Sequence, residues 1–234
     1  MMKLLENKWA LITGSSRGIG QQIALGLAER KCDIIVHARK AENADKTIGL
    51  LKPYGVKTHV VTGVLDSVEG VDGIIRAVEA LSVKLDILYN NAAIMSKWQP
   101  MWQIPQAEWL RVFQTNLFAM VQLCTAFAPG MKERGFGRII NLTSGIKDNP
   151  ELTPYSVSKA AVDKYSRDLA YELRGSNVLV NFLDPGWLKT DMGGANAEHD
   201  VETVLPGALV PALLEDNGPT GQFYAAQDYS MLQK

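Results

Sequence analysis

Short apolar runs alternate with amphipathic segments along the chain. Seven runs read as buried strands, and they comprise residues 9–13, 33–38, 57–62, 85–89, 138–142, 178–183 and 222–224. Six segments between or after them repeat apolar residues every three to four positions, and they comprise residues 19–30, 45–51, 68–81, 106–131, 154–174 and 201–214. The alternation of strands with helices predicts βαβ units and therefore a parallel sheet.

The predicted strands read as continuous apolar runs, without a regular polar alternation. This pattern is typical of strands whose sheet is covered by helices on both faces. We therefore predict one domain over residues 1–234. Its fold class is α/β, a doubly wound Rossmann-type domain with a parallel sheet of about seven strands.

Residues suited to binding and catalysis follow these strands directly. Residues 14–20 follow the first strand, Arg39 the second, residues 90–93 the fourth, Ser144 the fifth, and Pro185 with Gly186 the sixth. All of them lie beyond the carboxyl ends of strands, which in an open parallel sheet form the edge where ligands bind.

Composition excludes several classes of partner. The 234 residues include 21% charged residues and carry a formal net charge of −1, so nothing indicates binding to nucleic acid or to an anionic membrane surface. No apolar run reaches the roughly eighteen residues of a membrane span, and residues 1–6 are too short and too charged for a signal peptide. Cys32 and Cys124 lie in apolar runs, which predicts buried reduced thiols and a cytoplasmic protein. We predict no metal site.

Gly14, Gly18 and Gly20 have the spacing G-x-x-x-G-x-G between a strand and a helix. A glycine at such a turn permits positive φ, and others let the backbone approach a pyrophosphate at the helix N-terminus. A tight turn without a ligand is the alternative. Because a strand precedes the turn and a helix follows it, we predict a dinucleotide site.

The residues after the second strand distinguish NADP from NAD. NAD sites place an acid there, about twenty residues after the glycines, whereas residues 37–40 read H-A-R-K. Arg39, joined by Arg17, suits a 2′-phosphate, since guanidinium groups match phosphate oxygens. Two solvated surface arginines are the alternative. The sequence favours NADP(H) over NAD(H).

Tyr155 and Lys159 are four residues apart, so they share one face of the predicted helix. Thr153 and Pro154 fit an N-cap followed by proline, which places Tyr155 in the first turn. The ammonium group and the positive end of the helix should lower the phenol's pKa from its usual value near 10. A phenol so tuned can protonate a carbonyl oxygen as hydride arrives.

These features together resemble the classical short-chain dehydrogenase/reductase family over nearly the whole chain. The matching positions are residues 13–20, residues 90–93, Asn116, Ser144, Tyr155 with Lys159, and Pro185 with Gly186 through Thr190. The resemblance implies an NAD(P)-dependent oxidoreductase that moves hydride between the nicotinamide and a carbonyl or alcohol carbon.

The family also implies individual roles. Tyr155 is the general acid or base, Lys159 lowers its pKa and binds the nicotinamide ribose, Ser144 holds the substrate oxygen, and Asn116 supports a water relay to Lys159. The implied cofactor-binding residues are Gly14, Ser16, Arg17, Gly18, Ile19, Gly20, Arg39, Leu65, Asn91, Ala92, Ala93, Tyr155, Lys159, Pro185, Gly186 and Thr190. The family often has an acid near Val64, but here Asp66 lies two positions later, which leaves the backbone at Leu65 for the adenine. The interval from Ser144 to Tyr155 is about two residues shorter than usual in the family.

Large apolar residues gather near the predicted reaction site, and they are Met95, Trp98, Ile146, Trp187 and Met192. They favour a small or medium hydrophobic ketone or aldehyde, unless they are core or oligomer contacts. A 3-oxoacyl-carrier-protein reductase is the alternative, with Arg134 and Arg174 as docking residues, although Glu133 and Glu172 beside them weaken it. A non-catalytic NADP-binding regulator is the remote alternative.

Two predicted helices, at residues 106–131 and 154–174, carry more apolar residues than one face requires. The residues in excess are Leu117, Met120, Val121, Phe127, Val162, Tyr165, Leu169 and Leu173. We expect a homodimer or homotetramer that buries them. Deeper packing within one subunit is the alternative.

Overall fold

A parallel sheet of seven strands forms the centre of the protein, as the sequence predicts. The computed structural model describes residues 4–230. The strands are β1 (Trp9–Ile12), β2 (Asp33–Ala38), β3 (Thr58–Thr62), β4 (Leu85–Asn90), β5 (Gly137–Leu142), β6 (Val178–Asp184) and β7 (Phe223–Ala225). Their order in the sheet is β3-β2-β1-β4-β5-β6-β7, and every neighbouring pair is parallel. The order reverses between β1 and β4, the switch point at which doubly wound sheets bind ligands.

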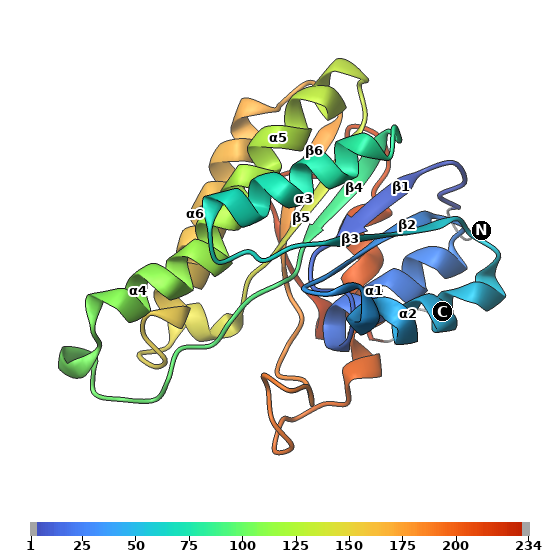
Figure 1. Cartoon of the computed structure of the whole chain (residues 1–234). Coiled ribbons are helices and arrows are strands. Elements are labelled where there is room, and N and C mark those ends of the chain that lie inside the picture. Colours follow the sequence, from blue (N-terminus) through green and yellow to red (C-terminus); the bar gives the residue numbers. More distant parts are fainter. Residues whose placement is uncertain (1–3, 231–234) are drawn as a thin grey trace.

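Helices cover both faces of this sheet (Figure 1). They are α1 (Gly18–Glu29), α2 (Asp45–Leu51), α3 (Val68–Ala80), α4 (Gln106–Phe113), α5 (Ala119–Glu133) and α6 (Tyr155–Glu172). The core on one face joins α1 and α2 to the segment Gly207–Ala212, and the core on the other joins α3, α5 and α6. Each face of the sheet is therefore buried, which explains why its strands are apolar throughout.

Two predicted helices differ from the structure. The helix expected at 106–131 is interrupted by a π-helical segment, Gln114–Phe118, between α4 and α5. The helix expected at 201–214 consists of two short 3₁₀ turns, Val201–Val204 and Gly207–Ala212. Pro206 and Pro211 account for the second difference, because proline has no N–H to donate and its ring clashes with the preceding helical turn.

The apolar excess that we expected on two helices lies mostly inside the subunit. Met120, Phe127, Val162 and Leu173 are buried, so the expectation is wrong for these four. Leu117, Val121, Tyr165 and Leu169 are partly buried against the same core. Other apolar side chains are exposed on α4, the π segment and α6, and they are Leu110, Phe118, Val157 and Tyr171.

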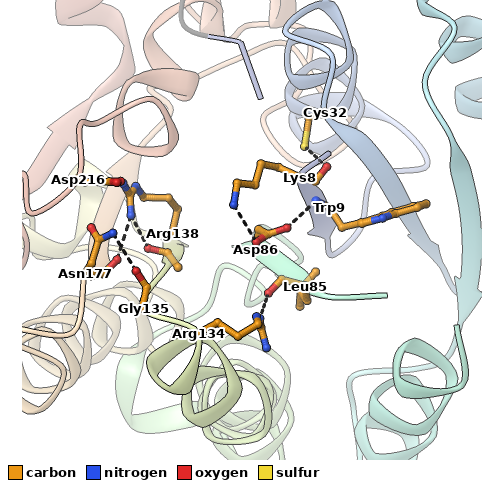
Figure 2. Close-up of polar contacts among 11 residues, drawn as sticks. Lys8, Trp9, Cys32, Leu85, Asp86, Arg134, Gly135, Arg138, Asn177 and Asp216 are labelled. Atoms are coloured by element: carbon orange, nitrogen blue, oxygen red, sulfur yellow. Dashed lines mark hydrogen bonds and ion pairs between the residues drawn. The ribbon is translucent and has the colours of Figure 1, made fainter. Parts of the chain in front are cut away.

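Charged residues close the amino ends of the strands (Figure 2). The Arg138 side chain is fully buried, and its guanidinium nitrogens donate to the carbonyl oxygens of Gly137, Asn177 and Leu214 and to Asp216 Oδ1 at 2.9–3.2 Å. A second group lies beside it. Lys8 Nζ is 3.3 Å from Asp86 Oδ1, and Asp86 Oδ2 accepts a 3.1 Å hydrogen bond from the Trp9 N–H.

The Phe136 ring lies between these two groups, with Lys8 Nζ at 3.8 Å and Arg138 Cζ at 4.5 Å from its centroid. The charged side chains at this edge therefore find partners within the protein.

Both cysteines are buried free thiols whose pKa is raised by burial. In the range 4–230, no helix has the length and apolar character needed to cross a membrane.

Candidate active site

The turn after β1 has the backbone geometry that its glycines predict. Gly14 has φ of +66° and Gly18 has φ of +58°, a region that strains residues with a Cβ. Gly20 is constrained by contact, because an added Cβ would lie 2.6 Å from both Asn91 Nδ2 and the Gly14 carbonyl oxygen. The turn leaves open backbone where side chains would otherwise stand, which is the cradle that a pyrophosphate needs.

The N-terminus of α1 fits an anion. Arg17 is its N-cap residue and makes no side-chain capping hydrogen bond, and the first turn contains no acid. The N–H groups there remain available at the positive end of the helix dipole. Ser16 and Ile19 flank this position and are half-buried. The arrangement fits the pyrophosphate of a dinucleotide.

A buried hydroxyl joins the glycine turn to β4. Thr13 Oγ1 donates to the Tyr89 carbonyl oxygen at 3.3 Å and accepts from the N–H groups of Asn91 and Ala92 at 2.9 and 3.0 Å. Asn91 Nδ2 returns a 2.8 Å hydrogen bond to the Thr13 carbonyl oxygen, and Ala93 follows, half-buried. Thr13 was absent from the predicted cofactor residues, although its place directly before the first glycine was a usable signal.

His37 holds the same turn from β2, a role that the sequence analysis did not predict. Its Nδ1 accepts a 2.9 Å hydrogen bond from the Gly14 N–H, and its Nε2 lies 3.2 Å from the Gly63 carbonyl oxygen. The first contact needs an unprotonated Nδ1, so the ring is neutral and Nε2 donates. Burial lowers the pKa of His37 to about 4, against a smaller opposing effect of the Gly63 hydrogen bond.

The two predicted arginines differ. Arg39 is exposed directly after β2 and makes no hydrogen bond or ion pair with any residue between 4 and 230. Arg17 is engaged, because its Nη1 lies 3.0 Å from Asp191 Oδ2 of the loop after β6. Thr190 of that loop packs against the glycine turn, since an added Cβ on Gly18 would lie 3.6 Å from Thr190 Cγ2. The sequence did not predict that this loop would supply a carboxylate to Arg17.

The remaining predicted cofactor residues lie at the same edge. Leu65 is buried after β3. Gly186 has φ of +84° and donates its N–H to Asp184 Oδ1 at 3.0 Å. The Pro185 carbonyl oxygen accepts a 2.9 Å hydrogen bond from Gln227 Nε2, which fixes the turn after β6.

Tyr155 is buried at the first position of α6. The N-cap residue is Pro154, not Thr153 as expected, and no side chain caps this helix. Burial raises the pKa of Tyr155 to about 12, the hydrogen bond with Ser144 lowers it, and the charge of Asp184 raises it. The expected lowering of this pKa is therefore wrong for the protein alone.

Lys159 does not offset this effect of burial on the pKa of Tyr155. Its Nζ donates to the Leu142 carbonyl oxygen at 2.8 Å and lies 5.7 Å from the centroid of the Tyr155 ring. The ammonium group of Lys159 therefore donates a hydrogen bond to the last residue of β5. Burial lowers the pKa of Lys159 to about 8, and the charges of Asp163 and Asp184 oppose that effect.

Asn116 lies in the π-helical segment, where its side chain turns toward the site. Its Oδ1 accepts from the Ile94 N–H at 2.8 Å, and its Nδ2 donates to the Ile94 carbonyl oxygen at 3.0 Å and to Ser158 Oγ at 3.1 Å. A cavity of about 10 Å³ lies between Asn116 and Lys159, with Leu65 and Thr115 also in its wall. This is enough space for one water molecule.

Ser144 follows β5 and begins the short 3₁₀ turn Gly145–Asp148, where its Oγ accepts from the Ile146 N–H at 3.4 Å. The Ser144 hydroxyl lowers the pKa of Tyr155, so two of the four predicted catalytic side chains lie close together. Ser144 acts on Tyr155, and Lys159 lies beside the Tyr155 ring. Asn116 shares a cavity wall with Lys159. The structure therefore brings the four predicted catalytic residues together.

The predicted apolar rim is more open than expected. Met95 and Ile146 are half-buried, whereas Trp98 is 71% exposed and Trp187 is 56% exposed. Trp187 is nevertheless oriented, because its Nε1 donates to the Gly193 carbonyl oxygen at 2.9 Å. Figure 1 shows the loops after β4 and β6 extending beyond the sheet on this side. The large side chains thus line an open approach.

A glycine turn at the switch point and a Ser–Tyr–Lys group beside it are the features of one family of oxidoreductases. The family model for short chain dehydrogenase matches residues 8–201. The chain belongs to the short-chain dehydrogenase/reductase family. This membership confirms the predicted fold and makes the protein an oxidoreductase of the NAD(P)-dependent type.

Curated relatives of this short-chain dehydrogenase are similar over most of the chain. The bovine (Bos taurus) dehydrogenase/reductase SDR family member 4 is 38% identical over 192 residues, which are 80% of this chain and 67% of that protein. The 5-keto-D-gluconate 5-reductase of Escherichia coli K12 is 32% identical over 210 residues, which are 89% of this chain and 82% of that protein.

Solved structures give the same fold with either dinucleotide. A 3-oxoacyl-(acyl-carrier-protein) reductase from Agrobacterium tumefaciens C58, with NADP bound, superposes with a TM-score of 0.83 at 26% identity, over 95% of this chain and 93% of that one. A 3-oxoacyl-[acyl-carrier protein] reductase from Brucella melitensis, with NAD bound, gives a TM-score of 0.83 at 26% identity, over 94% and 90%.

Proposed function

We propose that this short-chain dehydrogenase is an NADPH-dependent reductase of small or medium hydrophobic ketones or aldehydes. The observation that carries the proposal is the grouping of the buried Tyr155 with Ser144 and Lys159 at the same edge of the sheet as the glycine turn. With a pKa raised to about 12, Tyr155 is a proton donor at neutral pH. Reduction of a carbonyl requires a donor at this place.

In this mechanism, NADPH supplies the hydride when it is bound. The Ser144 hydroxyl and the Tyr155 hydroxyl hold the substrate oxygen by hydrogen bonds and orient the carbonyl carbon. As negative charge develops on that oxygen, the phenol O–H bond breaks and the proton forms the new alcohol O–H bond. Lys159 stabilises the phenolate that remains. A water molecule in the cavity beside Asn116 returns a proton toward Lys159.

The glycine turn and the N-terminus of α1 hold the pyrophosphate in this proposal. Arg39 is the residue that selects NADP, because it is an exposed guanidinium without a partner among the described residues, at the position where NAD sites place an acid. Arg17 joins it by leaving Asp191. Such an exposed ion pair contributes about 0–1 kcal/mol, so a phosphate competes with it readily.

The carrier-protein reductase remains the second candidate, supported by the names of the two solved structures above. Position argues against the predicted docking residues. Arg134 and Arg174 follow the C-terminal ends of α5 and α6, and the 18 residues of α6 place Arg174 about 27 Å from Tyr155. Arg134 also donates to the Leu85 carbonyl oxygen, and Arg174 lies over the Tyr171 ring.

A panel of substrates tests the proposal directly. The purified protein is mixed with ketones, aldehydes, sugar-derived ketones and acyl thioesters, and NADPH absorbance is followed. We expect the highest kcat/KM with a hydrophobic ketone or aldehyde. A preference for acyl thioesters would establish the second candidate, and NADPH binding without turnover of any compound would establish the regulator.

The proposal extends to assembly and compartment. Leu110, Phe118, Val157 and Tyr171 are exposed on α4, the π segment and α6, and a homodimer or homotetramer would bury them. Light scattering at micromolar concentration should give a multiple of the 25.7 kDa chain mass; a monomer would refute this assembly.

Buried free thiols support a reducing compartment such as the cytoplasm.

A further inference from the structure

One carboxylate at the reaction edge has no role in the proposed mechanism. Asp184 ends β6, and its Oδ1 accepts the 3.0 Å hydrogen bond from the Gly186 N–H. Its Oδ2 packs on Gly145, where an added Cβ would lie only 3.1 Å away. A single side chain therefore touches both the turn after β5, which carries Ser144, and the turn after β6.

This carboxylate also lies close enough to act on the reacting pair. Its negative charge raises the pKa of Tyr155, against the opposing hydrogen bond of Ser144, and raises the pKa of Lys159. In each case burial is the larger effect. Asp184 acts on both members of the pair, whereas Asp163 acts on Lys159 alone.

The other charged groups around the pair are largely engaged with one another. Asp163 lies one turn after Lys159 on α6, and its Oδ2 is 3.6 Å from Lys147 Nζ. Lys147 also pairs with the exposed Asp148 at 2.9 Å, and Arg167 adds a second positive charge near Asp163. Asp184 forms no ion pair with any residue in the described part of the chain. Its charge is therefore not engaged in an ion pair outside the reacting pair.

The hydrogen bond to Gly186 does not explain why this residue is charged. An asparagine oxygen would accept from the same N–H at the same place, without a negative charge beside the active site. We propose that Asp184 is a positioning residue for the reaction: it joins the Ser144 turn to the Pro185–Gly186 turn and keeps a negative charge beside Tyr155 and Lys159. The charge disfavours phenolate and favours ammonium, which keeps the pair in its proton-donating form. This inference rests on the proposed function only for its consequence in catalysis.

The test uses the full-length protein without cofactor, so it does not depend on activity. The lysine Cε resonances are followed by carbon NMR through a pH titration, and Lys159→Met identifies the Lys159 signal. The unmodified protein should show a Lys159 midpoint near pH 8. Asp184→Asn, which retains the hydrogen-bond acceptor, should lower that midpoint by about one unit. Asp148→Asn is the matched control, because its carboxylate is exposed and does not act on Lys159; it should leave the midpoint unchanged.

Kinetics supply the second readout. In Asp184→Asn, the alkaline limb of kcat/KM for carbonyl reduction should move to lower pH, as Tyr155 loses its proton more readily. A purely structural role would lower kcat/KM at every pH without moving the limb. Asp184→Ser serves in the same two measurements if the asparagine variant does not fold.

Unchanged Lys159 midpoints in a folded neutral variant would overturn the inference. The proposed function fails separately, through the absence of carbonyl reduction in the unmodified enzyme. A shifted midpoint in a protein that reduces no carbonyl would retain Asp184 as a positioning residue and reject only the assigned reaction.

Discussion

Replacing Tyr155 with phenylalanine removes one oxygen atom from the site and little else. The ring remains buried at the start of α6, and the lost hydrogen bond is the one to Ser144. The glycine turn, Thr13, His37 and Arg39 make no contact through this oxygen, so dinucleotide binding should persist. The change therefore isolates proton transfer from binding.

The expected magnitude follows from the chemistry of that oxygen. With a pKa of about 12, only about one phenol in 10⁵ is ionised at pH 7, so the donor is present in nearly every molecule. Loss of a positioned general acid typically lowers the rate about 10²- to 10⁴-fold. This corresponds to about 2.7–5.4 kcal/mol of transition-state stabilisation. We expect kcat to fall within this range while the Kd for NADPH changes less than about threefold.

The assay combines NADPH absorbance during turnover with NADPH fluorescence during binding. Tyr171→Phe is the matched control, since Tyr171 lies on the same helix but is 66% exposed and remote from the first turn. It should retain full activity. A Tyr155→Phe enzyme with near-normal kcat would refute the mechanism, whereas an equal loss in both variants would indicate damage to α6.

Three further changes test other parts of the structure. Ala38→Asp combined with Arg39→Ser should shift the ratio of kcat/KM values from NADPH toward NADH, and an unmodified enzyme that already prefers NADH would contradict the role of Arg39. Arg138→Met should lower the free energy of unfolding by about 3–5 kcal/mol in urea denaturation, because three carbonyl oxygens lose their donor, whereas Asp216→Asn at the exposed end should cost about 1 kcal/mol or less. The free energy of unfolding of the unmodified protein should fall as pH drops from about 6.5 toward 4, because His37 takes up a proton in the unfolded chain but not in the buried ring of the folded protein. His37→Phe should reduce this loss of stability and weaken NADPH binding about tenfold. An unchanged pH dependence of stability in that variant would exclude His37 as its source.

The strands of the sheet were predicted well from the sequence because a buried strand appears as a short run of apolar residues. Residues 33–38 and 45–51 form their elements with the predicted bounds, and most other elements differ by one or two residues. The glycine turn and the Tyr155–Lys159 spacing were also readable, since both depend on local geometry.

Features that depend on distant residues were not readable. The π-helical segment around Asn116 contains no proline or glycine that would mark it in the sequence. The Asn116 side chain is held by hydrogen bonds to the backbone of Ile94, which lies in another loop. The pKa of Tyr155 is raised, where a lowered value was expected, because the phenol is buried. The nearby ammonium group of Lys159 is hydrogen-bonded to the end of β5. The Arg17–Asp191 pair joins residues that are remote in the chain, as does the contact between His37 and Gly14.

The buried Arg138 has a consequence for the order in which the protein can be made. Its carboxylate partner, Asp216, is 78 positions later in the chain, and so the guanidinium leaves the ribosome long before the group that balances it. At about 5–20 residues per second, this delay lasts about 4–16 s. Throughout that interval the amino end of β5 carries an arginine whose carboxylate partner has not yet been made, and until Val178–Asp184 has emerged one edge of β5 lacks its neighbour β6. The nascent sheet therefore passes through an open-edged intermediate, the kind of species that chaperones protect from aggregation, and the Arg138 site can be completed only after residue 216 has emerged.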